Sequence, residues 1–349
     1  MLHRCRITGV GGFRPPVLTN DDFIAVMGRS ARVVDRKLEH EQRFSALDLS
    51  TGRPRTTNTE MAQHASAAAL QMAGIAPDDV DLVIYSTFTP DYPVPPCYTI
   101  LQERLEISHC MGFDIRSGCA GFGTAMVAAS QFLATGMARR ALVVGSELIS
   151  SRYLPYYANG KPDLPLKALF NLMFFGDGAG AVVLETCAPS EAGLFAVTMG
   201  SNRPTVPFGS LIPIGGSVHP YPTPEVSREE WAVTQDGPLT EEMVPAVAIE
   251  AIDRFLVENH FSLGDFDWAV LPIITESMRA RLQARFPELS DDRVLSVGPQ
   301  GGPLANAAIP LSLHLGVHEG HLRNGDRVLI YAAENTRYQH AVIGLTWNP

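Results

Sequence analysis

"FDIRSGCAGFGTAM", residues 113–126, is the segment on which the fold prediction turns. An apolar run that ends at Arg116 predicts a strand, and the alanine-rich run from Gly121 predicts a helix. Cys119 stands between them among small residues, so the chain can turn sharply there and leave the thiol uncovered. A cysteine at a helix N-terminus feels the positive end of the helix dipole, which favours the thiolate. The segment therefore indicates either a nucleophile or, as for many free cysteines, a small buried apolar residue.

The segments on either side continue the alternation of strand and helix. We expect helices over residues 57–75, 97–107 and 120–136, and strands over 80–90, 111–116, 139–150 and 178–185. Asn58 or Thr59 is expected to cap the first helix, and Gly74 to end it. This order is typical of a layered α/β fold.

The second half repeats the theme. Helices are expected over 241–260, 275–286 and 306–322, and strands over 266–274, 291–298, 326–334 and 340–347. The repetition predicts two similar halves, 1–187 and 188–349, related by an internal duplication. The stretches 156–173 and 201–237 look like inserted surface loops, suited to shaping a pocket or a partner site.

Composition restricts the class of protein. The chain has 349 residues, of which 46% are hydrophobic and 18% charged, so it can bury a sizeable core. A net charge of −10 argues against nucleic acid as the main partner. No apolar run reaches the length of a membrane span and the start lacks a signal-peptide core, so a cytoplasmic protein is expected. Five cysteines without ligand spacing argue against a disulfide framework or a zinc site.

Two glycine-rich runs invite a different interpretation, a phosphate-binding loop. The run "GCAGFG" at 118–123 lies between a strand and a helix, but its glycines do not follow the G-x-G-x-x-G order. The run "GDGAGA" at 176–181 precedes an expected strand rather than a helix. A dinucleotide-binding fold is therefore the weaker hypothesis.

Five segments, in order, resemble the β-ketoacyl-acyl-carrier-protein synthase III family of thiolase-like condensing enzymes. They are "GVGGFRPPVLTNDDF" (9–23), "IYSTFTPDYPVPP" (84–96), "FDIRSGCAGFGTAM" (113–126), "LVVGSELIS" (142–150) and "FFGDGAGAVVLE" (174–185). The resemblance implies a five-layered α-β-α-β-α fold of two pseudo-equivalent halves and a homodimer. It also implies acyl-CoA or acyl-carrier-protein thioesters as substrates, no tightly bound cofactor, and an acyl intermediate on Cys119.

The chain departs from the family at the other catalytic positions. The family's histidine would fall within Pro272–Ile274, where no histidine is present, and its asparagine would fall at Pro303. Asn306 lies three residues later, in the expected helix. Proline has neither a side-chain donor nor an N–H, so the usual partners in decarboxylation are missing.

The family's glycine-rich stretch near the C-terminus is also altered. Glu334, Asn335 and Thr336 stand in place of glycines. Backbone N–H groups can still stabilise an oxyanion, so we expect donors from Cys119 and from Asn335 or Thr336.

Three residues are candidates for a replacement base: Glu276, Glu334 and His219. A carboxylate can act as a base if burial raises its pKa, although Glu276 also fits a solvated acid at a helix start. His219 lies in a loop, where a solvated histidine is the simpler interpretation.

Other titratable residues are expected to have structural roles. His314, His318 and His321 have a helical spacing that would suit a metal, but a partly exposed helix face explains them as well, and no metal site is predicted. His340 is also expected to have a structural role. Glu147 and Asp177 lie in family-like runs and are expected to be structural.

The expected activity is that of an acyltransferase. It would take an acyl group from acyl-CoA or acyl-carrier protein onto Cys119 and pass it to an oxygen, nitrogen or carbon nucleophile, in fatty-acid-related or specialised-metabolite biosynthesis. Two alternatives stay open. One is a conventional decarboxylative 3-oxoacyl synthase with relocated partners. The other is a non-catalytic subunit that shapes an active homologue, against which the retained Cys119 segment argues.

Overall fold

Two five-stranded mixed sheets organise the molecule. The computed structural model describes residues 5–158, 161–188, 191–201, 205–273 and 275–349. The first sheet has the order β1 (Cys5–Phe13), β9 (Gly178–Thr186), β6 (Arg140–Glu147), β4 (Leu82–Ser86) and β5 (Met111–Ile115). The second has the order β10 (Leu194–Ser201), β16 (Gln339–Thr346), β15 (Arg327–Ala333), β13 (Trp268–Val270) and β14 (Val294–Leu295).

The two sheets share one strand pattern. In each, the first two pairings are antiparallel and the last two are parallel. This agreement fits the expected duplication, and the boundary at residue 187, between β9 and β10, remains a prediction.

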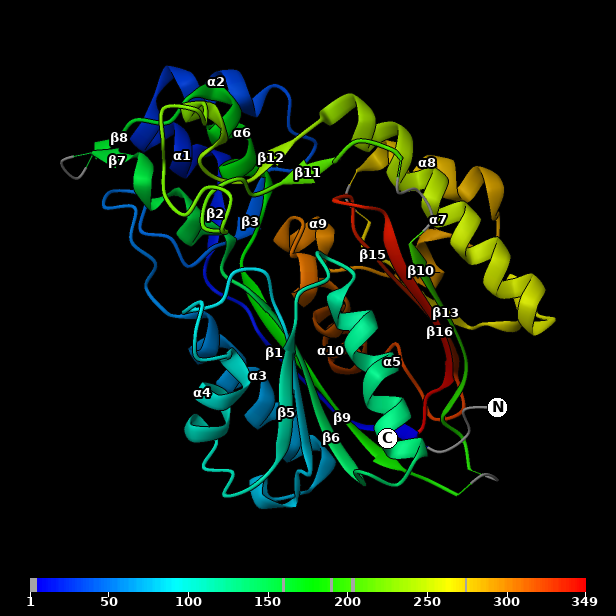
Figure 1. Ribbon diagram of the computed structural model, residues 1–349. Coiled ribbons are helices and arrows are strands. Elements are labelled where there is room, and N and C mark those ends of the chain that lie inside the picture. The colour runs from blue at the N-terminus through cyan, green and yellow to red at the C-terminus, as the bar shows by residue number, and fades with distance from the viewer. Residues whose placement is uncertain (1–4, 159–160, 189–190, 202–204, 274) are drawn as a thin grey trace.

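Helices complete five layers. The central helices α5 (Gly121–Ala134) and α10 (Ala308–His318) lie between the two sheets, within one apolar core formed from both halves. Outside the first sheet lie α3 (Asn58–Ala73) and α4 (Cys97–Arg104), and outside the second lie α7 (Gly237–Asn259) and α8 (Glu276–Arg285), as Figure 1 shows. The α-β-α-β-α fold class is therefore confirmed.

The alanine-rich face of α3 allows a very close approach to β1. A Cβ at Gly11 would lie 2.0 Å from the carbonyl oxygen of Ala65, and one at Gly9 would lie 2.1 Å from that of Ala69. Small residues on both elements are therefore needed for the helix to lie this close to the sheet.

The cap of α3 differs from the prediction. The Thr57 hydroxyl accepts the N–H of Glu60 at 3.2 Å, and the Glu60 carboxylate accepts the N–H of Thr57 at 2.8 Å, which is a capping box. Asn58 and Thr59 were wrong as caps because their buried side chains bond to the segment after β4 instead. Gly74 ends the helix in the left-handed conformation, as expected.

A smaller region covers the carboxyl ends of the central strands. It comprises α1 (Asn20–Met27), α2 (Arg29–Asp35), α6 (Leu166–Phe174), and the strand pairs β2 (Val17–Thr19) with β3 (Gln42–Phe44), β7 (Tyr157–Ala158) with β8 (Lys161–Pro162) and β11 (Ser210–Leu211) with β12 (Thr234–Gln235). The short helix α9 (Gly298–Gly301) lies against β3.

The interpretation of 156–173 as a surface loop was partly wrong. Most of its second part belongs to α6, where Ala168, Leu169, Leu172 and Met173 are buried in an apolar cluster with residues of α2. The amphipathic run 166–174 therefore forms a packed helix rather than a loop. The described part of 201–237 is mostly irregular, as expected. Of the helices in the described ranges, none combines the length and apolarity needed to span a membrane.

Candidate active site

Cys119 lies in the turn between β5 and α5. The helix begins at Gly121, two residues after the cysteine, and Gly118 takes a positive φ of 51° just before it. A Cβ at Gly118 would lie 2.9 Å from an Oε2 atom of Glu334. Glycine is therefore required there for conformation and for space, and the strand–turn–helix expected around Cys119 is confirmed.

The electrostatic setting of Cys119 is opposite to the expected one. Burial raises the pKa of the Cys119 thiol, and the nearby carboxylates of Glu334 and Glu147 raise that pKa further. Desolvation and two like charges both disfavour a thiolate. The direction of the shift is opposite to the expected low-pKa thiolate, so attack by Cys119 would require transfer of its proton.

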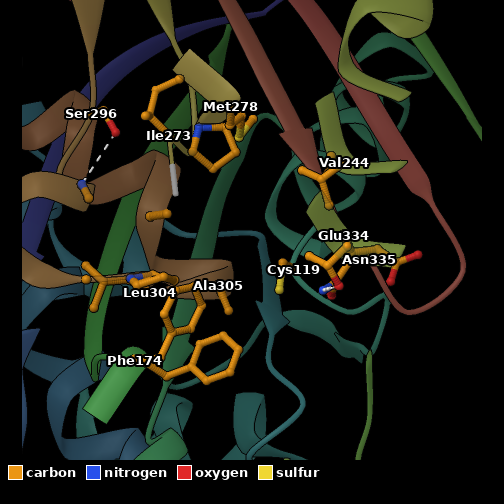
Figure 2. Close-up of a pocket in the computed structure, with 18 of the residues that line it drawn as sticks. Cys119, Phe174, Val244, Ile273, Met278, Ser296, Leu304, Ala305, Glu334 and Asn335 are labelled. Carbon is orange, nitrogen blue, oxygen red and sulfur yellow. Dashed lines mark hydrogen bonds between the residues drawn. The ribbon is translucent and has the colours of Figure 1, made fainter. Parts of the chain in front are cut away.

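Cys119 opens into a pocket built by both halves (Figure 2). The walls come from the end of α6, the first turns of α7, the segment after β13, the segment before α10 and the end of β15. Most of the lining is apolar: Phe174, Phe175, Val244, Val247, Pro272, Ile273, Met278, Pro303, Leu304, Ala305, Ala308 and Ala333. Such a lining suits an apolar chain attached to the cysteine.

The positions expected for the family's histidine and asparagine face this same pocket. Ile273 and Pro303 both line it. Neither side chain can donate a hydrogen bond or accept a proton. Ile274, which also belongs to the histidine stretch, lies outside the described residues.

Glu334 lines the pocket, but its carboxylate is already engaged. It accepts the N–H and hydroxyl of Thr336, the N–H of Arg337 at 2.9 Å and the N–H of Gln339 at 2.7 Å. These bonds fix the turn between β15 and β16. Glu334 therefore has a structural role in this turn.

Within the same turn, the two candidate oxyanion donors differ in whether their N–H group is already bonded. The N–H of Thr336 is bonded to Glu334, whereas Asn335 lines the pocket beside Cys119 and its side chain donates to the Thr240 hydroxyl at 3.3 Å. The geometry favours the N–H of Asn335 over that of Thr336, and an oxyanion role for either remains a prediction.

The two other candidate bases are not brought to the cysteine. Glu276 begins α8 with a side chain that is 74% exposed, and its carboxylate pairs with Arg279 at 3.3 Å. His219 lies in a partly exposed loop, where its carbonyl accepts the N–H of Gly215. Within the described parts of the chain, neither residue lines the Cys119 pocket. A solvated helix-start acid is the better description of Glu276.

A buried polar network beside Cys119 and the start of α5 was not foreseen. Asn306 lies in the 3-10 turn Ala305–Ala307, just before α10 rather than inside it as expected, and its amide donates to Glu147. Its Oδ1 atom accepts the Ser86 hydroxyl at 2.8 Å and the N–H of Phe122, in the first turn of α5, at 3.0 Å. The network therefore ties the segment before α10 to the start of α5.

Glu147 ends β6 at the centre of this network. Its carboxylate also accepts the Thr87 and Thr89 hydroxyls and the N–H of Phe88 at 3.1 Å. Burial raises the pKa of Glu147 to about 7, while these bonds lower it. In the sequence, the position of Glu147 at the end of the apolar run "ALVVGSE" is the feature that indicates a buried carboxylate.

Asp177 and the histidines have structural surroundings. The Asp177 carboxylate accepts the N–H groups of Ala46 and Ser150, both at 2.9 Å. The rings of His314 and His318 meet edge to face at 4.2 Å. His321 pairs with Glu319, and among the described residues no group of three potential ligands could hold a metal ion.

A second cavity of about 700 Å³ adjoins the Cys119 pocket. It is lined by α2, α6 and the starts of α7 and α8, and it carries Lys37 and Lys167. Five residues line both spaces: Phe174, Gln235, Thr240, Val244 and Met278. The outer cavity therefore borders the cysteine pocket along one shared wall.

Comparison with known proteins identifies the family of the chain. Residues 113–203, which include Cys119, match the family model for 3-oxoacyl-[acyl-carrier-protein (ACP)] synthase III. A β-ketoacyl-[acyl-carrier-protein] synthase III from Methylococcus capsulatus is 30% identical over 334 residues, covering 95% of this chain and 96% of the relative.

Solved structures of similar proteins share the fold over nearly the whole chain. The 3-oxoacyl-(acyl carrier protein) synthase III of Pseudomonas aeruginosa PAO1 has a TM-score of 0.81 and 25% identity, with 99% of each chain covered. AbyA1, a tetronic acid condensing enzyme, has a TM-score of 0.83 and 26% identity, covering 98% of this chain and 99% of its own. With a thiolase-type fold, a cysteine at the start of the central helix and full-length similarity, the chain belongs to the β-ketoacyl-acyl-carrier-protein synthase III family of condensing enzymes.

Proposed function

We propose that the protein is an acyltransferase that loads an acyl group onto Cys119 from an acyl-CoA or acyl-carrier-protein thioester. The acyl group then passes to an acceptor that needs little activation. One observation supports the proposal: Cys119 opens into an apolar pocket that is also lined by Ile273 and Pro303, which lie where the family's histidine and asparagine are expected.

The loading step balances without a cofactor. The sulfur of Cys119 attacks the thioester carbonyl, the new carbon–sulfur bond forms, and the bond to the departing thiol breaks. The proton lost by Cys119 ends on the departing thiolate, so no redox partner is needed. The N–H groups of Cys119 and Asn335 are the proposed donors to the tetrahedral oxyanion.

Decarboxylation makes a different demand. Loss of carbon dioxide from a malonyl thioester leaves negative charge on the thioester oxygen, which needs donors arranged in advance. Ile273 and Pro303 supply none, and the Glu334 carboxylate has the wrong sign. The site therefore suits acyl transfer better than the conventional condensation, which is the second candidate because of the relatives' names.

The outer cavity supports a thioester with a long carrier arm. It offers about 700 Å³ beside the Cys119 pocket, with Lys37 and Lys167 on its lining. Ammonium groups suit the phosphates that CoA and the carrier-protein arm share. The thioester is thus proposed as a substrate that enters from this side, not as a resident cofactor.

Assembly and pathway belong to the proposal as well. A homodimer joined through the first half would cover the half-buried edge strand β5, because exposed strand edges favour pairing. The similarity to AbyA1, a tetronic acid condensing enzyme, supports a place in specialised metabolism.

Intact-protein mass spectrometry after incubation with a panel of acyl-CoAs tests the proposal. We expect a single acyl adduct on the wild-type protein and none on Cys119→Ala. Cys110→Ala is the matched control, because Cys110 is also partly exposed but lies outside the pocket. An adduct that survives Cys119→Ala, or no adduct with any thioester, would overturn the proposal.

A further inference from the structure

The polar side chains that line the Cys119 pocket are almost all engaged within the protein. Glu334 accepts the turn amides, Asn335 donates to Thr240, and Thr240 donates to the carbonyl of Gly209 at 3.3 Å. Gln235 donates to Asn171 at 3.0 Å, and Ser296 accepts the N–H of Gly298 at 3.4 Å.

Tyr331 is the exception. It lines the same pocket and is fully buried, yet its hydroxyl has no hydrogen-bond partner among the described residues. A buried polar group without a partner costs folding free energy, so such a group in a native structure needs an explanation. The pocket that Tyr331 lines offers one, a hydrogen bond to a bound ligand.

The position of Tyr331 defines where a ligand atom would lie. It is on β15, two residues before Ala333, so both side chains point to the same face of the sheet. Its ring packs in the apolar cluster under α7 and α8 with Ile273 and Met278, which also line the pocket. Tyr331 therefore combines an unpartnered hydroxyl with a ring packed among apolar residues that line the pocket.

The Tyr331 hydroxyl is a neutral donor. Burial raises the pKa of Tyr331 far above its usual range, and the Glu334 carboxylate raises that pKa further. A protonated phenol both donates and accepts, so it can bond a hydroxyl or a carbonyl oxygen. It cannot bond a plain alkyl chain.

We propose that Tyr331 is the specificity residue of the acyl pocket and that it bonds an oxygen carried by the acyl chain. The preferred substrates are then hydroxyacyl or oxoacyl thioesters rather than plain fatty acyl thioesters. This inference rests on the proposed function, because it concerns the chain attached to Cys119.

The experiment compares loading rates of Cys119 by octanoyl-CoA and by the positional isomers of hydroxyoctanoyl-CoA and oxooctanoyl-CoA. One neutral hydrogen bond corresponds to a preference of about tenfold. We expect at least one isomer to load about tenfold faster than octanoyl-CoA on the wild-type protein. Tyr331→Phe should lose the preference, so that its loading rates for octanoyl-CoA and for the favoured isomer differ by no more than about twofold.

Tyr338→Phe is the matched control. Tyr338 is also fully buried with an unpartnered hydroxyl, but it lies outside the Cys119 pocket in the described structure. The control should keep the wild-type preference. The melting temperature of Tyr331→Phe should equal or exceed that of the wild type, because the hydroxyl has no protein partner to lose.

Each contrary result has a separate meaning. Equal loading of all isomers by the wild type, or a preference that survives Tyr331→Phe, would overturn the inference and leave acyl loading intact. A lower melting temperature of Tyr331→Phe would show that the hydroxyl bonds within the protein, which also overturns it. Absence of loading with every thioester would instead overturn the proposed function.

Discussion

The side-chain amide of Asn306 donates a hydrogen bond to the Glu147 carboxylate across 159 positions of sequence. The same amide group accepts the N–H of Phe122 and the Ser86 hydroxyl. The Asn306 side chain thus joins two strands of the first sheet and the start of α5. The position of Cys119, two residues before α5, depends on this junction.

Asn306→Ala is expected to destabilise the protein by about 3 kcal/mol, because it leaves a buried carboxylate, a hydroxyl and an N–H without their partner. Chemical denaturation measures the loss. Asn259→Ala is the control, since the Asn259 amide donates only to a carbonyl in its own helix and its loss should cost about 1 kcal/mol or less. Equal losses for the two variants would contradict a special role for Asn306.

Glu147 is expected to make stability depend on pH. Its pKa is about 7 in the folded protein against 4.5 for an unperturbed glutamate, so the folded state holds the proton more tightly. Protonated Glu147 makes its full contribution to the free energy of unfolding below pH 4.5. That contribution is lost as pH rises through 7, by about 3 kcal/mol in all. The free energy of unfolding of the wild type, measured relative to that of Glu147→Gln, should fall over that pH range. A difference between the two proteins that stays constant with pH would refute the prediction.

Gly121→Ala is expected to damage the junction by steric overlap. A Cβ at Gly121 would lie 2.1 Å from the Ser86 Oγ atom and 2.7 Å from the Asn306 Oδ1 atom. We expect a loss of about 2 kcal/mol or more in the free energy of unfolding. Gly216→Ala, where nothing lies within 4 Å, should be nearly neutral. A tolerated Gly121→Ala would show that the network can move.

Alkylation of Cys119 should require high pH. Burial and the carboxylates of Glu334 and Glu147 raise the pKa of the thiol, so the thiolate fraction is small at neutral pH. The iodoacetamide reaction rate at Cys119, followed by peptide mapping, should still rise beyond about pH 8.5. The same cysteine in the denatured chain serves as reference. If the alkylation rate of the folded protein reached its midpoint at a lower pH than that of the denatured chain, the raised pKa of Cys119 would be contradicted.

Malonyl-CoA should be decarboxylated far more slowly than Cys119 is acylated, because each absent donor or base is worth about 10²–10⁴ in rate. Release of labelled carbon dioxide measures one rate and intact mass the other. The double variant Ile273→His with Pro303→Asn should raise release at least about tenfold, whereas Ile273→Leu with Pro303→Ala should not. Fast release by the wild type would favour conventional condensation.

The sequence alone predicted the features that depend on neighbouring residues. The alternation of apolar and alanine-rich runs indicated the layered α/β class, because strand and helix periodicity are local. The small residues around Cys119 indicated the turn before α5 for the same reason. Position along the chain also led to the prediction that the family's histidine falls within Pro272–Ile274 and its asparagine at Pro303, and this replacement remains a prediction.

Only the tertiary structure decided which distant groups act together. Glu334 and Glu276 looked alike as candidate bases. Glu334 follows β15 and lines the pocket, whereas Glu276 begins α8 and is exposed. The Cys119 thiol was expected to be acidic, and burial beside carboxylates raises its pKa instead. Desolvation and long-range hydrogen bonds depend on contacts made after the chain has folded, so local sequence carries little record of them.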